Sequence, residues 1–285
     1  MKVVILAGGL GTRISEESMY KPKPMIEIGG MPILWHIMKV YSYYGFNEFI
    51  ICAGYKQHVI KQWFSEYFLH TSDVTFDFTK GNEVIIHNKH AEPWKVTIVD
   101  TGLNTQTGGR VKRIRDYIGD ETFLLTYGDA VGDINIKELV DFHKSHGRFG
   151  TVSVYNFGQN KGVLDINKDG SVGAFREKSD LDGDLINIGF MVFEPKLFDY
   201  IAGEREGIPR KPDPHGIYLL LEEIGIKKDK AVYVGDTEID VAVSYNAGID
   251  SVIVDWGFRD RNVLLACGAK NIVSDICSLY NELIK

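Results

Sequence analysis

The chain has few cysteines, no excess of basic charge and no long apolar run. Its 285 residues include three cysteines, Cys52, Cys267 and Cys277, with no CxxC pair and no histidine cluster beside them. A disulfide framework or a zinc site is therefore not expected, and reduced thiols in a cytoplasmic setting are the simpler interpretation. The opening apolar run, residues 3–7, is too short for the core of a signal peptide, and no run approaches the length of a membrane span. We expect a cytoplasmic protein with no membrane partner.

Acidic residues outnumber basic ones. The chain carries 32 Lys and Arg against 39 Asp and Glu, a formal net charge of -7. Proteins that bind nucleic acid generally use a basic surface, so the balance argues against a nucleic-acid partner. A local basic pocket for a phosphorylated small molecule remains compatible with it. With 44% hydrophobic and 25% charged residues, the composition is that of a globular protein of one large or two smaller domains.

Strand and helix patterns alternate over the first 155 residues. Short apolar runs predict strands, and apolar residues at helical spacing predict helices. The predicted strands are 2–7, 47–53, 95–100, 122–127 and 150–155, and the predicted helices are 32–44, 57–69 and 136–146. This alternation predicts an α/β fold with a Rossmann-like, mostly parallel sheet covered by helices. Residues 160–195 instead hold short strand-like pieces between Asp/Gly turns, which indicates antiparallel strands or a local excursion.

The composition breaks near residue 203, at a stretch rich in Gly, Pro and charge, GEREGIPRKPDPHG. A second alternating unit follows, with predicted helices at 214–225 and 238–247 and predicted strands at 231–236 and 251–256. We therefore predict a nucleotide-binding domain over residues 1–202 and a smaller C-terminal α/β segment over residues 207–285.

Glycines come directly after the first predicted strand, in VVILAGGLGTR. Glycines that lead from a strand toward a helix leave backbone N–H groups bare for a phosphate. The dinucleotide fingerprint GxGxxG is not met, because Ile14 stands at its third glycine position, and no GK[ST] of a Walker A loop follows. On the glycines alone, a structural turn is an equally good interpretation.

Cations near these glycines favour the phosphate interpretation. Thr12 offers a hydroxyl, and Arg13 offers a planar fork of donors suited to phosphate oxygens. Pro22 and Pro24 restrict the backbone on either side of Lys23, which helps to hold that cation in place. The alternative is that Lys23 is an ordinary solvated lysine. The spacing of the two motifs argues against that alternative.

These motifs, with EIGGMPILWHIM, EPWKVTIVDTG, TGGRVKRIRDYIGDETFLLTYGD and EKSDLDGDLINIGFMVFEP, carry a family resemblance. Over residues 1 to about 202 the chain resembles the sugar-1-phosphate nucleotidyltransferases, and within them the branch that transfers a cytidylyl group from CTP to glucose 1-phosphate. The resemblance implies Mg²⁺ as cofactor and a nucleoside triphosphate and a sugar 1-phosphate as substrates. It leaves the oligomeric state open, with a homo-oligomer allowed.

The resemblance also implies roles for individual residues. The nucleotide site would comprise Leu6, Ala7, Gly8, Gly9, Gly11, Thr12, Arg13, Lys23, Thr107, Gly108, Gly109 and Gly128. Arg13 and Lys23 would act at the reacting phosphates. The sugar phosphate would contact Glu177, Lys178 and Asn187, and Asp129 would hold Mg²⁺.

The position of Asp129 fits that role on chemical grounds. It follows the apolar run FLLTY, and open α/β sheets bind ligands at the carboxyl ends of their strands. Mg²⁺ prefers a few carboxylates together with phosphate oxygens and water. A loop or helix-capping aspartate is the alternative, and YGDAVGDIN contains competing candidates.

Residues 207–285 resemble a different family, the C-terminal half of haloacid-dehalogenase-like phosphatases. In RKPDP, Lys211 matches that family's phosphate-binding lysine, and in GDTEID, Asp236 and Asp240 match its Mg²⁺ ligands. The nucleophilic aspartate of that family has no convincing counterpart. Asp182 in DLDG follows AFREKS, which is no buried strand, so we expect no phosphoaspartate phosphatase activity.

The first resemblance is incomplete as well. Members of the nucleotidyltransferase family continue beyond this point with a second metal-binding aspartate, for which Asp236 and Asp255 are candidates by position only. The chain thus resembles the front of one enzyme joined to the back of another, whether as a natural fusion remnant, a recombination product or an engineered chimera. Nucleotidyl transfer is the leading hypothesis, with activity reduced if the second carboxylate is missing. A phosphohydrolase and a non-catalytic nucleotide- or sugar-phosphate-binding protein are the alternatives.

Overall fold

The computed structural model describes residues 1–9, 20–88, 90–156, 163–166, 172–176, 185–201 and 208–284, with the backbone alone at 156, 163–166, 172–176 and 185–186. The chain forms two compact units, Met1–Phe198 and Asp199–Lys285. The domain limits predicted above stay predictions, because residues 202–207 lie outside the described residues.

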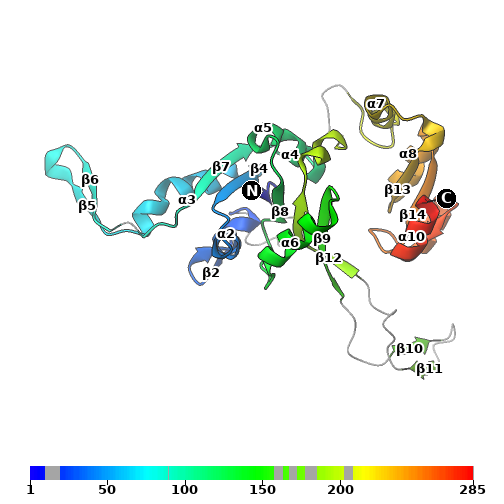
Figure 1. Cartoon of the computed structure of the whole chain (residues 1–285), viewed down its shortest axis with the longest axis horizontal. Coiled ribbons are helices and arrows are strands. Elements are labelled where there is room, and N and C mark those ends of the chain that lie inside the picture. Colours follow the sequence, from blue (N-terminus) through cyan, green and yellow to red (C-terminus); the bar gives the residue numbers. More distant parts are fainter. Residues whose placement is uncertain are drawn as a thin grey trace. The chain divides into compact units, whose positions relative to one another are not determined.

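Unit 1 is built on a six-stranded sheet with the order β7-β4-β1-β8-β12-β9 (Figure 1). Its strands are β1 (Val3–Ala7), β4 (Glu48–Ala53), β7 (Lys95–Asp100), β8 (Phe123–Tyr127), β9 (Gly150–Asn156) and β12 (Leu185–Phe193). Parallel pairing joins β7, β4, β1 and β8, and β12 runs antiparallel to both β8 and β9. The predicted mostly parallel sheet is thus confirmed, and β12 is its one strand of opposite direction.

Strand β1 lies at the centre of this sheet. Ile5 pairs with Ile51 on one side and with Thr126 on the other. Continuous apolar sequence suits such a strand, because a parallel sheet covered by helices is buried on both faces. Val3, Val4 and Ile5 are accordingly fully buried.

Three long helices accompany the sheet, α2 (Ile33–Tyr43), α3 (Gln57–His70) and α6 (Ile136–His146). Helix α2 buries positions 34, 37, 38 and 41, the i, i+3, i+4, i+7 spacing of one helical face. Helix α6 begins at Asn135, whose side chain accepts a hydrogen bond from the Glu138 N–H at 3.1 Å, and ends at Gly147 in the left-handed conformation. The sequence predicted all three helices to within a residue or two.

Shorter elements complete unit 1. They are η1 (Lys23–Met25), β2 (Glu27–Ile28), β3 (Met31–Pro32), β5 (Val74–Asp77), η2 (Phe78–Lys80), β6 (Glu83–Ile86), α4 (Thr107–Arg113), α5 (Arg115–Ile118), β10 (Val163–Ile166), β11 (Val172–Arg176) and η3 (Pro195–Asp199). The β5–β6 hairpin extends away from the sheet (Figure 1), and the sequence analysis did not predict it. Its strands are four residues long and mostly exposed, so they lack the buried apolar run on which strand prediction depends.

Unit 2 is a smaller α/β unit with a parallel three-stranded sheet, in the order β13-β14-β15. Its elements are α7 (His215–Ile224), η4 (Lys228–Lys230), β13 (Val232–Gly235), α8 (Glu238–Ala247), β14 (Asp250–Val254), α9 (Arg261–Ala266), β15 (Ile272–Val273) and α10 (Ile276–Leu283). The sheet core centres on β14, where Val252 and Ile253 are buried.

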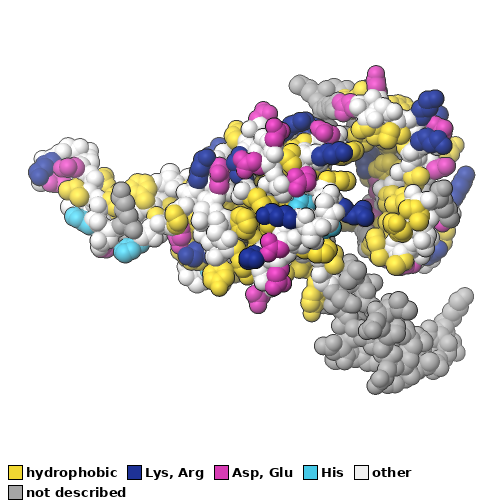
Figure 2. All heavy atoms as spheres, viewed as in Figure 1, with side chains coloured by type: hydrophobic (Ala, Val, Ile, Leu, Met, Phe, Trp, Pro, Cys, Tyr) yellow, Lys and Arg dark blue, Asp and Glu magenta, His cyan; other side chains and the backbone are white. Residues whose placement is uncertain are grey.

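Basic and acidic side chains are interspersed on the face of unit 1 that Figure 2 draws, without one continuous basic tract among the described residues. Within the part of the chain that the structure describes, no helix combines the length and the apolarity needed to cross a bilayer.

Candidate functional site

The opening glycine motif begins at the carboxyl end of β1. Leu6 and Ala7 are the last residues of that strand, Gly8 is buried, and Gly9 is exposed. The middle of a parallel sheet, at the carboxyl ends of its strands, is where α/β proteins of this kind bind ligands. The structure therefore brings the start of the predicted nucleotide loop to a suitable edge. Three predicted residues of that loop lie outside the described residues: Gly11, Thr12 and Arg13.

Lys23 and Asp129 lie side by side at this edge. Lys23 is the first residue of η1, and Asp129 comes two residues after the end of β8. The Lys23 Nζ is 3.8 Å from Asp129 Oδ2, with 20% of the lysine and 47% of the aspartate side chain exposed. A cation and a carboxylate are thus held together, although they are 106 residues apart in sequence.

Gly128 explains how the two come together. Its N–H donates to the Leu6 carbonyl at 2.9 Å, so the end of β8 follows β1 beyond the last pair of the strands. A Cβ at Gly128 would lie 2.9 Å from that carbonyl oxygen and 3.0 Å from Pro24 Cγ. Pro24 is buried against this bare backbone and fixes the neighbouring Lys23. Packing of Pro24 on Gly128 therefore places the KPKP motif, and Lys23 with it, next to the segment that carries Asp129.

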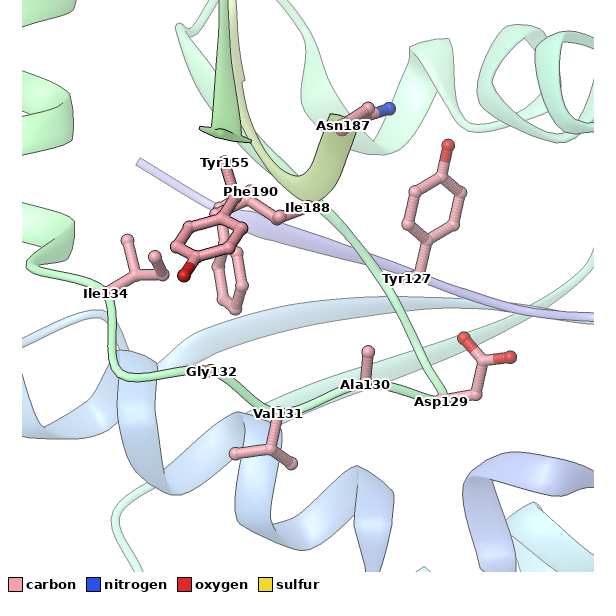
Figure 3. Close-up of a pocket in the computed structure, with 10 residues that line it drawn as sticks. All are labelled: Tyr127, Asp129, Ala130, Val131, Gly132, Ile134, Tyr155, Asn187, Ile188 and Phe190. Carbon is pink, nitrogen blue, oxygen red and sulfur yellow. The ribbon is translucent and has the colours of Figure 1, made fainter. Parts of the chain in front are cut away.

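A cavity of about 370 Å³ opens beside Asp129. Figure 3 shows Tyr127, Asp129 and Asn187 at one end and Ile134, Tyr155 and Phe190 at the other. The remaining lining residues are Ala130, Val131, Gly132 and Ile188. One end of the cavity thus offers polar groups, and the other is mainly apolar and aromatic, with the Tyr155 hydroxyl among its side chains. Sequence motifs indicated Asp129 as a metal ligand and Asn187 as a sugar-phosphate ligand, roles that stay predictions, whereas Tyr127, Tyr155, Ile188 and Phe190 carried no such signal.

An irregularity in β12 shapes this cavity. The register of β12 against β9 shifts between Asn187 and Met191, and Gly189 has a φ of +89°. The Gly189 N–H donates to Asn187 Oδ1 at 2.8 Å. The ring of Tyr127 lies against Gly189, where a Cβ would come 2.6 Å from Tyr127 Cδ2. The only signal for this in the sequence is a glycine inside an apolar strand.

The TGG stretch forms the first turn of a short helix. Thr107 and Gly108 are exposed at the start of α4, and Gly109 is buried. The next residue, Arg110, is 5% exposed and donates to Gly8 O at 2.9 Å. The structure thus links this predicted part of the nucleotide site to the opening loop through a side chain that the sequence analysis did not single out.

Two predicted sugar-phosphate ligands, Glu177 and Lys178, lie outside the described residues. Asn187 is exposed at the cavity.

In unit 2 the structure joins Lys211 to Asp240. The Lys211 Nζ and the Tyr233 hydroxyl each donate to Asp240 Oδ1 at 2.9 Å. Asp240 Oδ2 accepts from the Thr237 hydroxyl at 2.7 Å, in a capping box at the start of α8. Burial raises the pKa of Asp240, but the hydrogen bonds from Thr237, Lys211 and Tyr233 outweigh it and hold the pKa below its ordinary value. Both carboxylate oxygens are therefore engaged within unit 2.

Asp236 lies at the carboxyl end of β13 and accepts a hydrogen bond from the Phe258 N–H at 2.8 Å. Asp255, the other candidate for a second metal carboxylate, pairs with Arg261 at 2.8 Å and accepts from Ser274 at 2.7 Å. In the described residues, no group of three or more His, Cys, Asp or Glu side chains is arranged to hold a metal. The metal roles of Asp236 and Asp240 stay predictions.

A nucleotidyl transferase family model matches residues 2–233, and a haloacid-dehalogenase-hydrolase-like model matches residues 208–279. Glucose-1-phosphate cytidylyltransferases of Salmonella typhimurium and Salmonella typhi are each 53% identical over 213 residues, 74% of this chain and 82% of theirs. The crystal structure of HddC from Yersinia pseudotuberculosis is 26% identical, covers 69% of this chain and 78% of its own, and has a TM-score of 0.47.

These matches confirm both resemblances inferred from the sequence motifs. The family model and the Salmonella relatives extend over most of the chain, and the hydrolase-like model is confined to its C-terminal part. The chain belongs to the nucleotidyl transferase family and carries a haloacid-dehalogenase-like segment at its C-terminal end.

Proposed function

We propose that this protein transfers a cytidylyl group from CTP to glucose 1-phosphate and releases pyrophosphate. The observation that carries the proposal is the Lys23–Asp129 pair, which lies beside a cavity at the carboxyl edge of the sheet. The choice of CTP and glucose 1-phosphate is supported by the names of relatives with 53% identity.

The chemistry requires positioning and charge neutralisation more than covalent help. An oxygen of the sugar phosphate attacks the α-phosphorus of CTP, and the bond to the departing pyrophosphate breaks. Lys23 offers a cation at the edge where both anions would meet. In this proposal the loop with Gly11, Thr12 and Arg13 holds the triphosphate, and Asn187 holds the sugar phosphate together with Glu177 and Lys178.

The residues around Asp129 fit a Mg²⁺ ion held largely by substrate. Mg²⁺ typically takes one or two carboxylates and completes its shell with phosphate oxygens and water. The Asp129 carboxylate is half exposed at the cavity, and its contact with Lys23 at 3.8 Å is longer than a tight ion pair. Asp129 would hold the ion, which would neutralise charge on the phosphates when bound.

Unit 2 is proposed not to hydrolyse phosphomonoesters. Asp240 already holds Lys211 and the first turn of α8, so both oxygens have partners within the unit. The proposal itself rests on the nucleophilic aspartate of such phosphatases, for which the sequence offers only Asp182, a residue that follows no buried-strand pattern and lies outside the described residues. Lys211, with 55% of its side chain exposed, keeps a positive charge at this edge of unit 2.

The test is pyrophosphate release from CTP with and without glucose 1-phosphate. The proposal expects release that requires both substrates and Mg²⁺, and that falls at least about 100-fold in Lys23→Met, because a cation at the reacting phosphates is worth about 3 kcal/mol. Lys21→Met is the matched control, since Lys21 pairs with Glu27 and not with Asp129. Full activity of Lys23→Met would refute the role of the pair.

Two further readouts separate the alternatives. Hydrolysis of a generic phosphomonoester without CTP would favour the phosphohydrolase. A rise in melting temperature with CTP but no turnover would favour a non-catalytic binding protein.

A further inference from the structure

Arg110 is a buried cation that bonds to backbone oxygens. It belongs to α4, and 5% of it is exposed. Its Nη1 donates to Thr101 Oγ1 at 2.7 Å, to Gly102 O at 2.8 Å and to Ala53 O at 3.3 Å. Its Nη2 donates to Gly8 O at 2.9 Å and to Leu103 O at 3.2 Å. These five acceptors are four backbone carbonyls and a hydroxyl, and the Asp100 carboxylate acts on Arg110 through its charge.

These acceptors come from the carboxyl ends of three neighbouring strands. Gly8 follows β1, Ala53 ends β4, and residues 101–103 follow β7. Burying a charge is costly unless hydrogen bonds replace its water, and a guanidinium has five donors in a rigid fork that can reach several acceptors at once. Backbone hydrogen bonds from Thr101 N–H to Ala53 O and from Tyr55 N–H to Gly8 O still link neighbouring segments here, and the Arg110 side chain adds bonds to all three of them.

Two glycines provide the space for this guanidinium. A Cβ built on Gly8 would collide with Arg110 Nη1, and one built on Gly54 would lie 2.6 Å from the same atom. Gly9, in contrast, has no atom of the described residues within 4 Å of its Cβ position. The first glycine of the AGG stretch thus faces the arginine, whereas a Cβ on the second would meet no atom in the part of the chain that the structure describes.

The carbonyl of Gly8 is held from two sides. It accepts from Arg110 Nη2 and from the Tyr55 N–H at 3.3 Å. The peptide that links Gly8 to Gly9 carries this carbonyl, so its orientation fixes the direction in which the chain leaves β1. The Gly9 N–H belongs to the same planar peptide and is oriented with it.

We propose that Arg110 is a positioning residue of the nucleotide site, which holds the Gly8 peptide so that the loop after β1 starts in its ligand-binding orientation. This inference rests on the proposed function for the identity of the ligand. Arg110 acts through Gly8 and does not itself contact the nucleotide.

The first experiment measures melting temperatures without ligand, for Gly8→Ala, Arg110→Met and the double variant. Both single variants disturb the same contact, the one between Gly8 and Arg110. The double variant is therefore expected to melt no more than about 2 °C below the less stable single variant. Gly9→Ala is the matched control, and a melting temperature within about 2 °C of wild type is expected because its Cβ has room. Additive losses in the double variant would overturn the Gly8–Arg110 link.

The second experiment measures CTP affinity and the KM for each substrate. Arg110→Met is expected to weaken CTP binding at least tenfold and to leave the KM for glucose 1-phosphate within about twofold. Arg113→Met is the control. Arg113 is on the same helix and donates to Thr101 O at 2.6 Å and to Thr105 Oγ1 at 2.8 Å, but it does not bond to Gly8. Arg113→Met is expected to keep its CTP affinity within about threefold of wild type, although its melting temperature falls by about as much as that of Arg110→Met.

Arg110→Lys distinguishes geometry from charge. A lysine keeps the charge but lacks the fork that spans three strand ends, so it is expected to restore less than a third of the lost affinity. Wild-type affinity in Arg110→Lys would overturn the proposal, as would equal loss of CTP affinity in the Arg113 and Arg110 variants.

If Arg110→Met does not fold, Arg110→Lys and Gly8→Ala are compared in the same two assays. Wild-type protein that binds no CTP would refute the proposed function, while the melting temperatures would still decide the Gly8–Arg110 link.

Discussion

Gly189→Ala should damage both the fold and the cavity beside Asp129. An alanine at a φ of +89° costs about 1 to 2 kcal/mol in backbone strain. Its Cβ would also lie 2.6 Å from Tyr127 Cδ2, and relieving such an overlap typically costs a further 1 to 3 kcal/mol, about 2 to 5 kcal/mol in all.

The consequence for function follows from the place of Tyr127. Its ring lines the cavity, and Asp129 is two residues further along the same segment (Figure 3). When the Tyr127 ring moves away from the new methyl group, we expect Asp129 and the cavity wall to shift with it. Displacements of about 1 Å at a reacting centre can cost about 100-fold in rate, so we expect kcat/KM for glucose 1-phosphate to fall about 10- to 100-fold.

Gly45→Ala is the matched control. Gly45 has a φ of +88° in the same unit, but no atom of the described residues lies within 4 Å of its Cβ position. It should show the strain of about 1 to 2 kcal/mol without the overlap, which is a fall in melting temperature of roughly 2 to 8 °C at normal kcat/KM. The assays are thermal unfolding and pyrophosphate release. Equal kcat/KM in the two variants would refute the role assigned to the contact between Gly189 and Tyr127.

Three other predictions concern the core and unit 2. Phe49→Ala should destabilise unit 1 by about 3 to 5 kcal/mol in denaturant unfolding, because Phe49 is fully buried, while Phe78→Ala on the exposed hairpin should change it by less than about 0.5 kcal/mol. Asp240→Asn should lower the stability of the protein at neutral pH, since its amide would face hydrogen-bond donors. The pKa of Asp240 is lowered in the folded state, so its carboxylate contributes fully above the ordinary value of 3.8 and loses this contribution as the pH falls through the lowered pKa. The gap between the melting curves of wild type and Asp240→Asn should therefore start to narrow below pH 3.8 and be smallest once the pH is below the lowered pKa, and a gap that does not narrow on acidification would contradict the assignment. Asp182→Asn should leave any trace of phosphomonoester hydrolysis unchanged, and complete loss in a colorimetric phosphatase assay would show that Asp182 is a nucleophile.

Much of the fold was predictable because it rests on local patterns. The apolar run of β1 reflects burial on both faces of the sheet, and the 3.6-residue spacing of apolar residues in α2 reflects burial of one helical face. Both patterns are visible in the sequence alone. The parallel direction of the main strands follows from the helices between them. Strand β12 was harder to place, because its antiparallel position depends on pairing with β8, which is far away in sequence.

The candidate site was partly predictable. Ordered motifs pointed to Lys23 and Asp129, and the structure brings these two side chains together at one sheet edge. Tyr127 and Phe190 carried no such signal, because an aromatic residue in an apolar strand is usually part of the core. Their place in the cavity depends on the bulge at Gly189.

What the sequence determined by itself was the alternation of strands and helices, the family, and the residue types at the carboxyl edge of the sheet. Only the tertiary structure decided why Gly8 is a glycine and what Arg110 does. These two residues are 102 positions apart, and their contact exists because three parallel strands end side by side. Hydrophobic periodicity is a local property that a sequence displays directly. The space around a backbone atom depends on every segment packed against it, so it is known only once the chain has folded.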